Sequence, residues 1–226
     1  MRLDKYLVEC GIGSRKDVKK IIDIGAVSVN GKIILSAKES VNEENDTVKY
    51  KEEIIKYKKF RYYILNKKLG YITAVEDPKD KTVMELLPDW VIKKDLAPVG
   101  RLDKDTEGLL LLTNDGQLNH KLLSPKSHVE KTYYADLEKD ISEYDLEKLR
   151  EGVDIGGYIT MPAKAESPAP KQILLTIKEG KFHQVKKMLE AVNNKVVYLK
   201  RITFGKIQLG NMELGEVREI NLDDIV

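Results

Sequence analysis

The stretch from Val99 to Gly116, VGRLDKDTEGLLLLTNDG, places a charged loop directly before the most apolar run of the sequence. Arg101, Asp103 and Asp105 all lie in this loop, which is more charge than a turn into a core strand requires. A carboxylate held against a rigid core is a candidate nucleophile or general base, so the loop is a candidate active site. The ordinary alternative is an Asp that only accepts hydrogen bonds from loop amides.

The element behind the loop is predicted from the run Leu109–Leu112, which is bounded by Gly108 and by Asn114-Asp115-Gly116. A short unbroken apolar run is typical of a strand buried on both faces, and the flanking glycines favour a strand over a helix core. A helix is expected next, ending before Ser124-Pro125. The loop is therefore expected to be mounted on a rigid scaffold.

Two later segments contain polar groups that could complete a site. Tyr133 lies in a predicted strand, where its neighbour Tyr134 should point to the opposite face. Residues 172–177 alternate as a strand, and the apolar residues from Phe182 to Val192 have helical spacing, with Lys186 beside the apolar stripe. Taken alone, such a tyrosine is ordinary packing and such a lysine an ordinary solvated side chain.

The composition excludes several classes of protein. A net charge of +2 on 226 residues, 34% of them charged, means that nucleic-acid binding would have to come from local basic faces. Cys10 is the single cysteine, so no internal disulfide forms, and the three histidines lack metal-site spacing. No apolar run is as long as a membrane span, and the N-terminus lacks a signal-peptide core. We expect a soluble cytoplasmic protein without a metal.

Residues 1–50 have the pattern of a small unit with two helices and a β-hairpin. Ser14 followed by Asp17 is typical of a helix N-terminus, and Gly25 of the end of that helix. Asn30-Gly31 after an alternating segment is a strong hairpin signal. The basic side chains of the second helix lie away from its apolar stripe, which suits phosphate contacts or simply a solvated face.

The rest of the chain suggests a second, larger unit. Residues 42–59 are predicted to contain the last strand of the first unit and then a linker, so the boundary is placed after residue 58. Beyond it we expect a strand at 62–66, a turn at 66–70 and a short helix at 82–87. The predicted fold class is α+β, with domains 1–58 and 59–226, the second containing a mixed, mostly antiparallel sheet flanked by helices.

The motifs of the second domain resemble those of the pseudouridine synthases, in the branch that acts on the small ribosomal subunit. GRLD followed by DTEGLLLLTNDG is similar to the catalytic motif, SPxxHxEKTY to the tyrosine motif, and EGKFHQVKKM to the third motif. The resemblance departs from the family pattern at Lys68, where most members have a proline. The resemblance implies catalytic roles for Asp103, Tyr133 and Lys186, and substrate contacts by Arg101, Ile177 and Gln184.

The first domain resembles the S4 domain, a small RNA-binding fold found in a ribosomal protein and in RNA-modifying enzymes. RLDKYL, GIGSRKDVKKII and GAVSVNGK match it in order and spacing. The resemblance implies RNA-backbone contacts by five residues of this domain: Arg2, Ser14, Arg15, Lys16 and Lys19.

Together, these resemblances imply an enzyme that isomerises one uridine of 16S ribosomal RNA without a cofactor. The base must be flipped out of the RNA, and Arg101 could fill the vacated place in the stack. Lys186 would stabilise the charge of the nucleophile Asp103, and whether Asp103 attacks the sugar or C6 of the base stays open. The expected partner is ribosomal RNA or a small-subunit assembly intermediate, bound by a monomer and without a membrane. The alternatives are a 23S target or a non-catalytic RNA-binding assembly factor.

Overall fold

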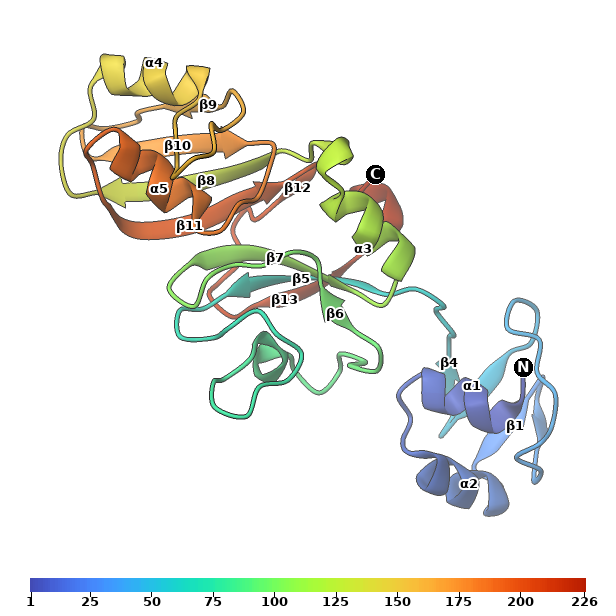
Figure 1. Ribbon diagram of the computed structural model, residues 1–226. Helices are drawn as coiled ribbons and strands as arrows, with labels where there is room; N and C mark the ends of the chain where they lie inside the picture. The colour runs from blue at the N-terminus through green and yellow to red at the C-terminus, as the bar shows by residue number, and fades with distance from the viewer. The chain divides into compact units, whose positions relative to one another are not determined.

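The computed structural model describes residues 1–226, which form two compact units (Figure 1). The first unit comprises Met1–Phe60 together with Asp89–Lys94, and the second comprises Arg61–Pro88 and Asp95–Val226. The short segment 89–94 thus groups with the first unit, although the sequence assigned it to the second domain. None of the helices combines the length and the apolar character that a membrane span needs.

The first unit contains two helices and an antiparallel sheet with strand order β2-β1-β3-β4. The elements are α1 (Leu3–Glu9), α2 (Arg15–Asp23), β1 (Val27–Val29), β2 (Lys32–Ile33), β3 (Val48–Tyr50) and β4 (Glu53–Ile55). Its core combines residues of both helices with residues of β1 and β3, so the helices pack on the sheet: Leu3, Tyr6, Leu7, Val18, Ile22, Val27, Val29, Val41 and Val48.

The local signals of this unit are confirmed. Ser14 and Asp17 form a reciprocal capping box at the start of α2. Gly25 follows α2 with φ of +73°, and Asn30 and Gly31 both have positive φ in the tight β1–β2 turn. The expectation of one strand and a linker in residues 42–59 is wrong, because β3 and β4 form a hairpin there. Its turn residues Lys51 and Glu52 have positive φ without being glycine, so their residue types do not signal a turn.

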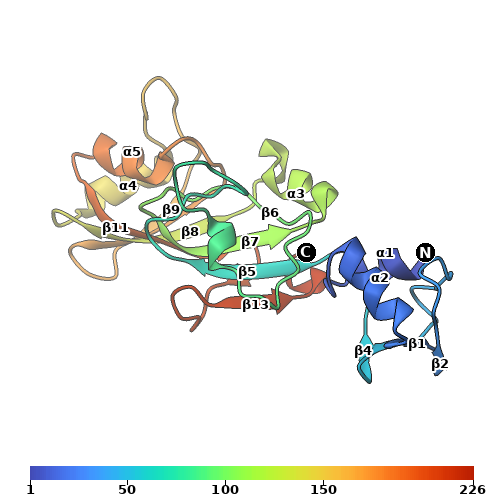
Figure 2. The same ribbon diagram turned by 90° about the horizontal axis from the view of Figure 1, so that it is seen from below.

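The second unit is built on a mixed nine-stranded sheet with the order β13-β5-β7-β11-β8-β10-β9, to which β6 and β12 add at β7 and β11. Only β7 and β11 run parallel. Figures 1 and 2 show β13, β5 and β7 side by side, and α5 against the part formed by β8, β10 and β11. The strands are β5 (Tyr62–Lys67), β6 (Ala97–Pro98), β7 (Glu107–Thr113), β8 (Lys131–Leu137), β9 (Lys164–Glu166), β10 (Gln172–Ile177), β11 (Val196–Phe204), β12 (Ile207–Gln208) and β13 (Val217–Ile220).

Helices surround this sheet, and the predicted α+β class with a mostly antiparallel sheet is confirmed. The helices are α3 (Gly116–Leu123), α4 (Glu143–Glu151), α5 (Gln184–Ala191) and the 3₁₀ turns η1 (Val83–Leu86), η2 (Pro125–Ser127) and η3 (Leu222–Asp224). As predicted, α3 ends before Ser124-Pro125. The helix expected at 82–87 is a single 3₁₀ turn.

Strand β7 is the predicted buried strand, and all of its residues are buried. It pairs with β5 on one side and with β11 on the other. Gly108 has φ of +104°, and a Cβ atom there would lie 2.2 Å from the backbone oxygen of Arg201. Only glycine therefore allows β7 to approach β11 this closely, and the loop before β7 is held beside β11.

Two boundaries differ from the sequence prediction in ways that affect the site. The turn expected at 66–70 begins later, because β5 continues through Lys67, whose side chain is fully buried. The helix expected from Phe182 begins at Gln184 instead. His183 has a left-handed backbone with φ of +52°, which interrupts the helical periodicity, and Phe182 is 64% exposed.

Candidate active site

A cavity of about 610 Å³ lies in the second unit. One wall is the loop Gly100–Asp103 in front of β7, and the opposite wall is the segment 177–186, which leads from β10 into α5. Strands β8 and β11 contribute side chains between these walls. The cavity therefore brings together segments that are far apart in the sequence, and the loop, strand β8 and the segment 177–186 each contain part of one of the predicted motifs.

The floor of the cavity is one face of the sheet. In the antiparallel ladder Tyr133 of β8 lies opposite Arg201 of β11, and Lys131 lies opposite Ile177 of β10. Residues opposite each other project from the same face, as do residues two apart in a strand. These four side chains line the cavity, and those of Tyr133, Ile177 and Arg201 are buried. Tyr134 is outside the cavity lining, and its hydroxyl donates to Asp136.

Two basic side chains from the opposite wall of the cavity lie close to the Asp103 carboxylate. Lys186 Nζ lies 3.2 Å from Asp103 Oδ2, and His183 Nε2 lies 3.6 Å from Asp103 Oδ1. The resemblance implied the Lys186 pairing, whereas His183 had not been singled out. His183 reaches Asp103 because its left-handed backbone places it at the start of α5, a conformation that the residue type does not signal.

Lys186 is shared between two carboxylates. Its Nζ lies 2.6 Å from Asp105 Oδ1, which is closer than its contact with Asp103. Burial alone disfavours the charged ammonium, but its hydrogen bonds to Asp105 and Asp103 outweigh that effect and raise the pKa of Lys186. The hydrogen bond from Lys186 also lowers the pKa of Asp105. Asp105 was not among the predicted site residues, and in the structure its carboxylate makes the shorter of the two contacts with Lys186.

The buried side chain of Lys67 holds the backbone of the loop that contains Asp103. Its Nζ donates hydrogen bonds to the carbonyls of Thr106 at 2.8 Å, Asp103 at 3.0 Å and Lys68 at 3.1 Å. Burial lowers its pKa to about 8, opposed by the charges of the nearby acids. Lys67 was not singled out from the sequence, because a lysine directly before Lys68-Leu69-Gly70 is typical of an exposed turn.

Thr73 supports the same loop from another direction. Its hydroxyl donates to the carbonyl of Leu102 at 2.7 Å and accepts from the Leu102 amide at 3.0 Å. The residue before Asp103 is therefore held through both backbone groups. A carboxylate on a loop fixed at these points is positioned before any substrate binds.

Lys131 and Arg201 make the cavity floor cationic, and neither was predicted from the sequence. Burial, with a smaller contribution from the charge of Arg201, lowers the pKa of Lys131 to about 8. Both cations lie over the ring of Phe204, and Arg201 Nε donates to the carbonyl of Leu109 at 2.7 Å. Arg201 Nη2 is buried without a hydrogen-bond partner. Cations inside β-strands give no sequence signal of their own, since such side chains are usually exposed.

Arg101 and Gln184, the two remaining residues predicted to contact substrate, differ in their exposure. Arg101 is exposed at the cavity and forms no ion pair. Gln184 is buried, and its amide is fully engaged within the protein. Its Oε1 accepts from the Lys181 amide at 2.8 Å, and its Nε2 donates to Glu179 Oε1 at 2.8 Å. These bonds make Gln184 a residue that positions the segment leading into α5 rather than one with a free group for RNA.

The predicted contacts of the first unit also divide into two groups. Arg2 forms two hydrogen bonds with the carboxylate of Asp4, and the Ser14 hydroxyl is used in the cap of α2. In contrast, three basic side chains on α2 are exposed and form no ion pair: Arg15, Lys16 and Lys19.

Comparison with known proteins identifies the class to which this fold and cavity belong. Residues 61–191 match the model of the RNA pseudouridylate synthase family, and residues 1–48 match the S4 domain. The chain belongs to the RNA pseudouridine synthases, which are isomerases of uridine in RNA, and its S4 domain is an RNA-binding module.

The relatives span the whole chain. The uncharacterized RNA pseudouridine synthase YtzG of Bacillus subtilis is 48% identical over 231 residues, covering 100% of this chain and 97% of the relative. Ribosomal small subunit pseudouridine synthase A of Escherichia coli is 38% identical over 228 residues, covering 100% and 98%. A crystal structure of a pseudouridylate synthase matches with a TM-score of 0.68 and 35% identity, covering 99% of this chain and 97% of the other.

These relatives confirm the enzyme class that the sequence motifs implied. The motifs also pointed to the small-subunit synthase, but identity is higher with YtzG, whose name specifies no RNA target. The identification therefore stands at the level of an RNA pseudouridine synthase with an S4 domain.

Proposed function

We propose that this protein converts one uridine of ribosomal RNA, in the 16S RNA of the small subunit, into pseudouridine, with Asp103 as the nucleophile. The observation that supports the site is the Asp103 carboxylate, whose Oδ2 lies 3.2 Å from Lys186 Nζ at a cavity floored by Tyr133 and Ile177. The observation that supports the target is the full-length match to a synthase named for the small ribosomal subunit.

The reaction breaks the bond between C1′ of the ribose and N1 of uracil, turns the base, and forms a bond between C1′ and C5. Afterwards the proton on C5 leaves and N1, which has lost its bond to the sugar, gains one, so the product is an isomer of uridine and no oxidant or reductant is needed. Asp103 attacks either C1′ of the sugar or C6 of the base and is released when the new bond has formed. Lys186 stabilises the carboxylate before attack and after release.

The floor residues hold the base while it is detached. Tyr133 and Ile177 are buried side chains of the cavity lining against which a uracil ring can pack, and the Tyr133 hydroxyl passes on the proton released from C5. Arg101 is exposed beside the cavity and unpaired, so it enters the place that the flipped nucleotide leaves. Gln184 acts indirectly, by fixing the segment that contains His183 and Lys186.

The first domain, residues 1–58, contributes affinity rather than chemistry in this proposal, and residues 59–226 contain the catalytic machinery. Arg15, Lys16 and Lys19 are, with Lys20, exposed cations of α2 that are free to contact phosphates. The partner is ribosomal RNA or an assembly intermediate of the small subunit, and the chain acts as a monomer without a cofactor.

The test is a map of pseudouridines in ribosomal RNA from cells with and without the protein, and from cells that contain only the Asp103→Asn variant. Loss of one 16S pseudouridine in both the deletion and the variant is expected. Loss of a 23S position would overturn the target but not the chemistry. An unchanged map would favour a binding or assembly factor instead.

A further inference from the structure

Phe182 is an apolar ring exposed at the edge of the catalytic cavity. It is 64% exposed and belongs to the cavity lining. Its periodicity with Val185 and Met188 predicts a buried position on α5, but the left-handed backbone at His183 turns it out of the helix. Exposing a large aromatic side chain gives up the free energy of burial, so its placement at the mouth of a binding site points to an interaction with the ligand.

The ring of Phe182 is held in a defined orientation. It stacks on His183, with ring centroids 3.8 Å apart and planes inclined by 18°. His183 in turn lies 3.6 Å from Asp103. Phe182 is thus connected to the catalytic carboxylate through a single intervening side chain. A group that stacks on Phe182 belongs to a part of the RNA directly beside the nucleotide whose base reaches Asp103.

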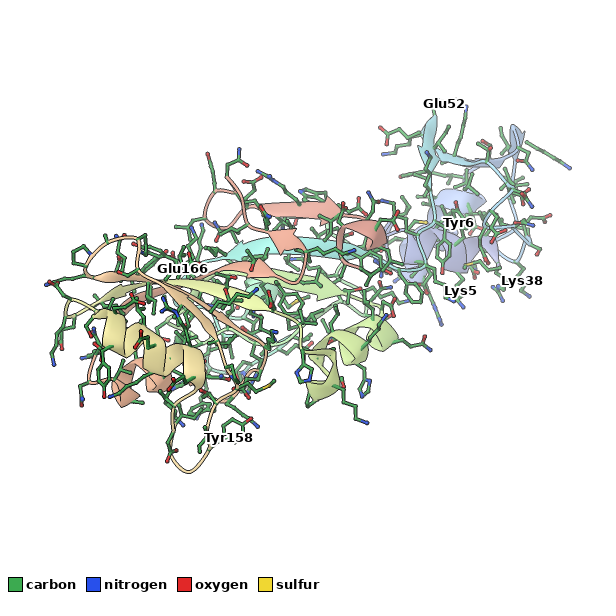
Figure 3. All side chains as sticks on the ribbon, turned by 90° about the horizontal axis from the view of Figure 1, so that it is seen from above. Lys5, Tyr6, Lys38, Glu52, Tyr158 and Glu166 are labelled. Atoms are coloured by element: carbon green, nitrogen blue, oxygen red, sulfur yellow. The ribbon has the colours of Figure 1, made fainter.

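A second aromatic ring lies in the same cavity lining. Tyr158 is 38% exposed and sits on a loop between α4 and β9 that projects from the strands (Figure 3). Its hydroxyl donates to Glu179 Oε2 at 2.7 Å, and Glu179 Oε1 accepts from the Met161 amide at 2.9 Å. Glu179 therefore ties this loop to the segment that contains Phe182, and both rings are held before RNA binds.

Each ring also has a lysine over it. Lys181 Nζ is 4.1 Å from the ring centroid of Tyr158, and Lys187 Nζ is 5.4 Å from that of Phe182. Aromatic rings interleaved with cations are the surface that unpaired nucleotides recognise, because bases stack on the rings and phosphates contact the cations.

We propose that Phe182, stacked on His183, is a platform for an unpaired nucleobase adjacent to the target uridine. The enzyme then selects a uridine whose neighbour is free to leave the helical stack, and it disfavours a target inside a continuous duplex. This inference rests on the proposed function only in requiring that the target base enters the cavity at Asp103.

The test compares Phe182→Leu, which removes the ring but keeps apolar bulk, with Phe182→Trp, which keeps a stacking surface. The matched control is Tyr144→Leu. Tyr144 is 66% exposed on α4 with Lys148 Nζ 4.3 Å from its ring centroid, but it is outside the cavity lining. The binding probe is a single-stranded oligouridylate of about ten nucleotides, long enough to span one aromatic platform and its flanking contacts.

Phe182→Leu should weaken oligouridylate binding by roughly tenfold, the loss expected for one stacked base, whereas Phe182→Trp and Tyr144→Leu should bind like the wild type. The slope of log affinity against log salt should not change, because no phosphate contact is lost. Unchanged binding by Phe182→Leu, or a lower salt slope, would overturn the platform.

A second measurement uses steady-state kinetics on a short RNA that contains the modified uridine. In this substrate each neighbouring nucleotide is replaced in turn by an abasic one. One abasic position should raise the KM of the wild type by roughly tenfold with little change in kcat, and should cost Phe182→Leu nothing further. Equal abasic penalties in both proteins would refute the stacking assignment. If the wild type modified no ribosomal uridine, the proposed function would fail, while the oligouridylate result would still decide the platform.

Discussion

The two basic regions of this protein differ in how their cations are held. On α2 of the S4 domain, Arg15, Lys16 and Lys19 are exposed and unpaired. In the catalytic unit, Lys67 is fully buried under three carbonyls and Lys186 lies between two carboxylates. Exposed cations attract phosphates from a distance, whereas desolvated ones fix the geometry and charge of a few atoms. Variants of the first region should therefore change binding, and variants of the second should change chemistry or folding.

The largest expected effect is that of Asp103→Asn, which replaces the proposed nucleophile by an amide of the same shape. Turnover should be lost by at least about a thousandfold, because an amide does not form the covalent intermediate. RNA affinity should stay within about threefold of the wild type, since the α2 cations are untouched. Release of the C5 hydrogen from labelled uridine in RNA measures turnover, and filter binding measures affinity.

Asp105→Asn serves as the control for this change. Asp105 contacts Lys186 but is mostly exposed, so its loss should lower turnover only partially, within about tenfold. Turnover by Asp103→Asn at the level of Asp105→Asn would refute the assignment of the nucleophile.

The second effect concerns Lys67, which should act through the position of the loop rather than through substrate. Lys67→Met leaves buried carbonyls without a donor, and the free energy of unfolding should fall by about 2 kcal/mol. Turnover of the folded variant should also fall, with little change in RNA affinity. Urea denaturation and single-turnover assays below room temperature separate the two losses.

Lys68→Met is the matched control, because Lys68 is the next residue and its side chain is exposed. Its free energy of unfolding should stay within about 0.5 kcal/mol of the wild type. Equal stability of the Lys67→Met and Lys68→Met variants would show that the buried ammonium does not support the loop.

The third-largest expected effect concerns RNA binding by the exposed cations on α2 of the S4 domain. A triple variant, Arg15→Gln, Lys16→Gln and Lys19→Gln, should bind RNA more weakly and reduce the slope of log affinity against log salt by roughly one unit per lost phosphate contact. The single-turnover rate at saturating RNA should change by less than about threefold. A collapse of that rate with unchanged binding would mean that α2 completes the active site.

The control for the triple variant removes the same charge elsewhere. Lys32, Lys171 and Lys195 are exposed, form no ion pair and do not line the cavity. Replacing all three by glutamine should leave the salt slope nearer to that of the wild type. If both triple variants had the same slope of log affinity against log salt, the weaker binding would follow from the loss of net charge and not from contacts by α2.

The smallest expected effect is on stability at alkaline pH. The pKa of Lys131 is lowered to about 8 in the folded protein, below its ordinary value of 10.5. Between these two values the unfolded chain binds more protons at this position, so this lysine makes stability rise with pH. The stability of Lys131→Met should therefore rise less than that of the wild type as the pH increases from about 8 towards 10.5. Parallel curves from urea denaturation would show that Lys131 is solvated.

Much of the fold could be predicted because local signals and burial agree. Leu109–Leu112 predicted β7, Ser14 with Asp17 predicted the start of α2, and Asn30-Gly31 predicted the first hairpin. In each case the residue types that favour the element also satisfy its backbone or its core.

The site was predicted less completely, because tertiary context decides which polar residues are buried. Asp103 and Lys186 could be singled out from their motifs, but Lys67, Lys131 and Arg201 resemble ordinary surface residues in the sequence. Their burial follows from strands that pair only in three dimensions.

The predicted position of Phe182 in the helix was wrong for a different reason, namely the backbone conformation of His183. Its spacing fits an apolar stripe, but helical periodicity was extended across His183, where the chain adopts a left-handed conformation. Periodicity reports which residues could share a face and not where the helix begins.

The contact between Gly108 and the backbone of Arg201 has a consequence for how related sequences are compared. A larger residue at position 108 would collide with the main chain of β11, and the loop before β7 would shift although the side chains of Asp103, Tyr133 and Lys186 are intact. Relatives that keep the aspartate, tyrosine and lysine but replace this glycine are therefore candidates for inactive members that a search for catalytic residues alone would count as enzymes. The missing side chain at Gly108 thus helps to set the position of the Asp103 loop, because a Cβ atom there would collide with the Arg201 backbone.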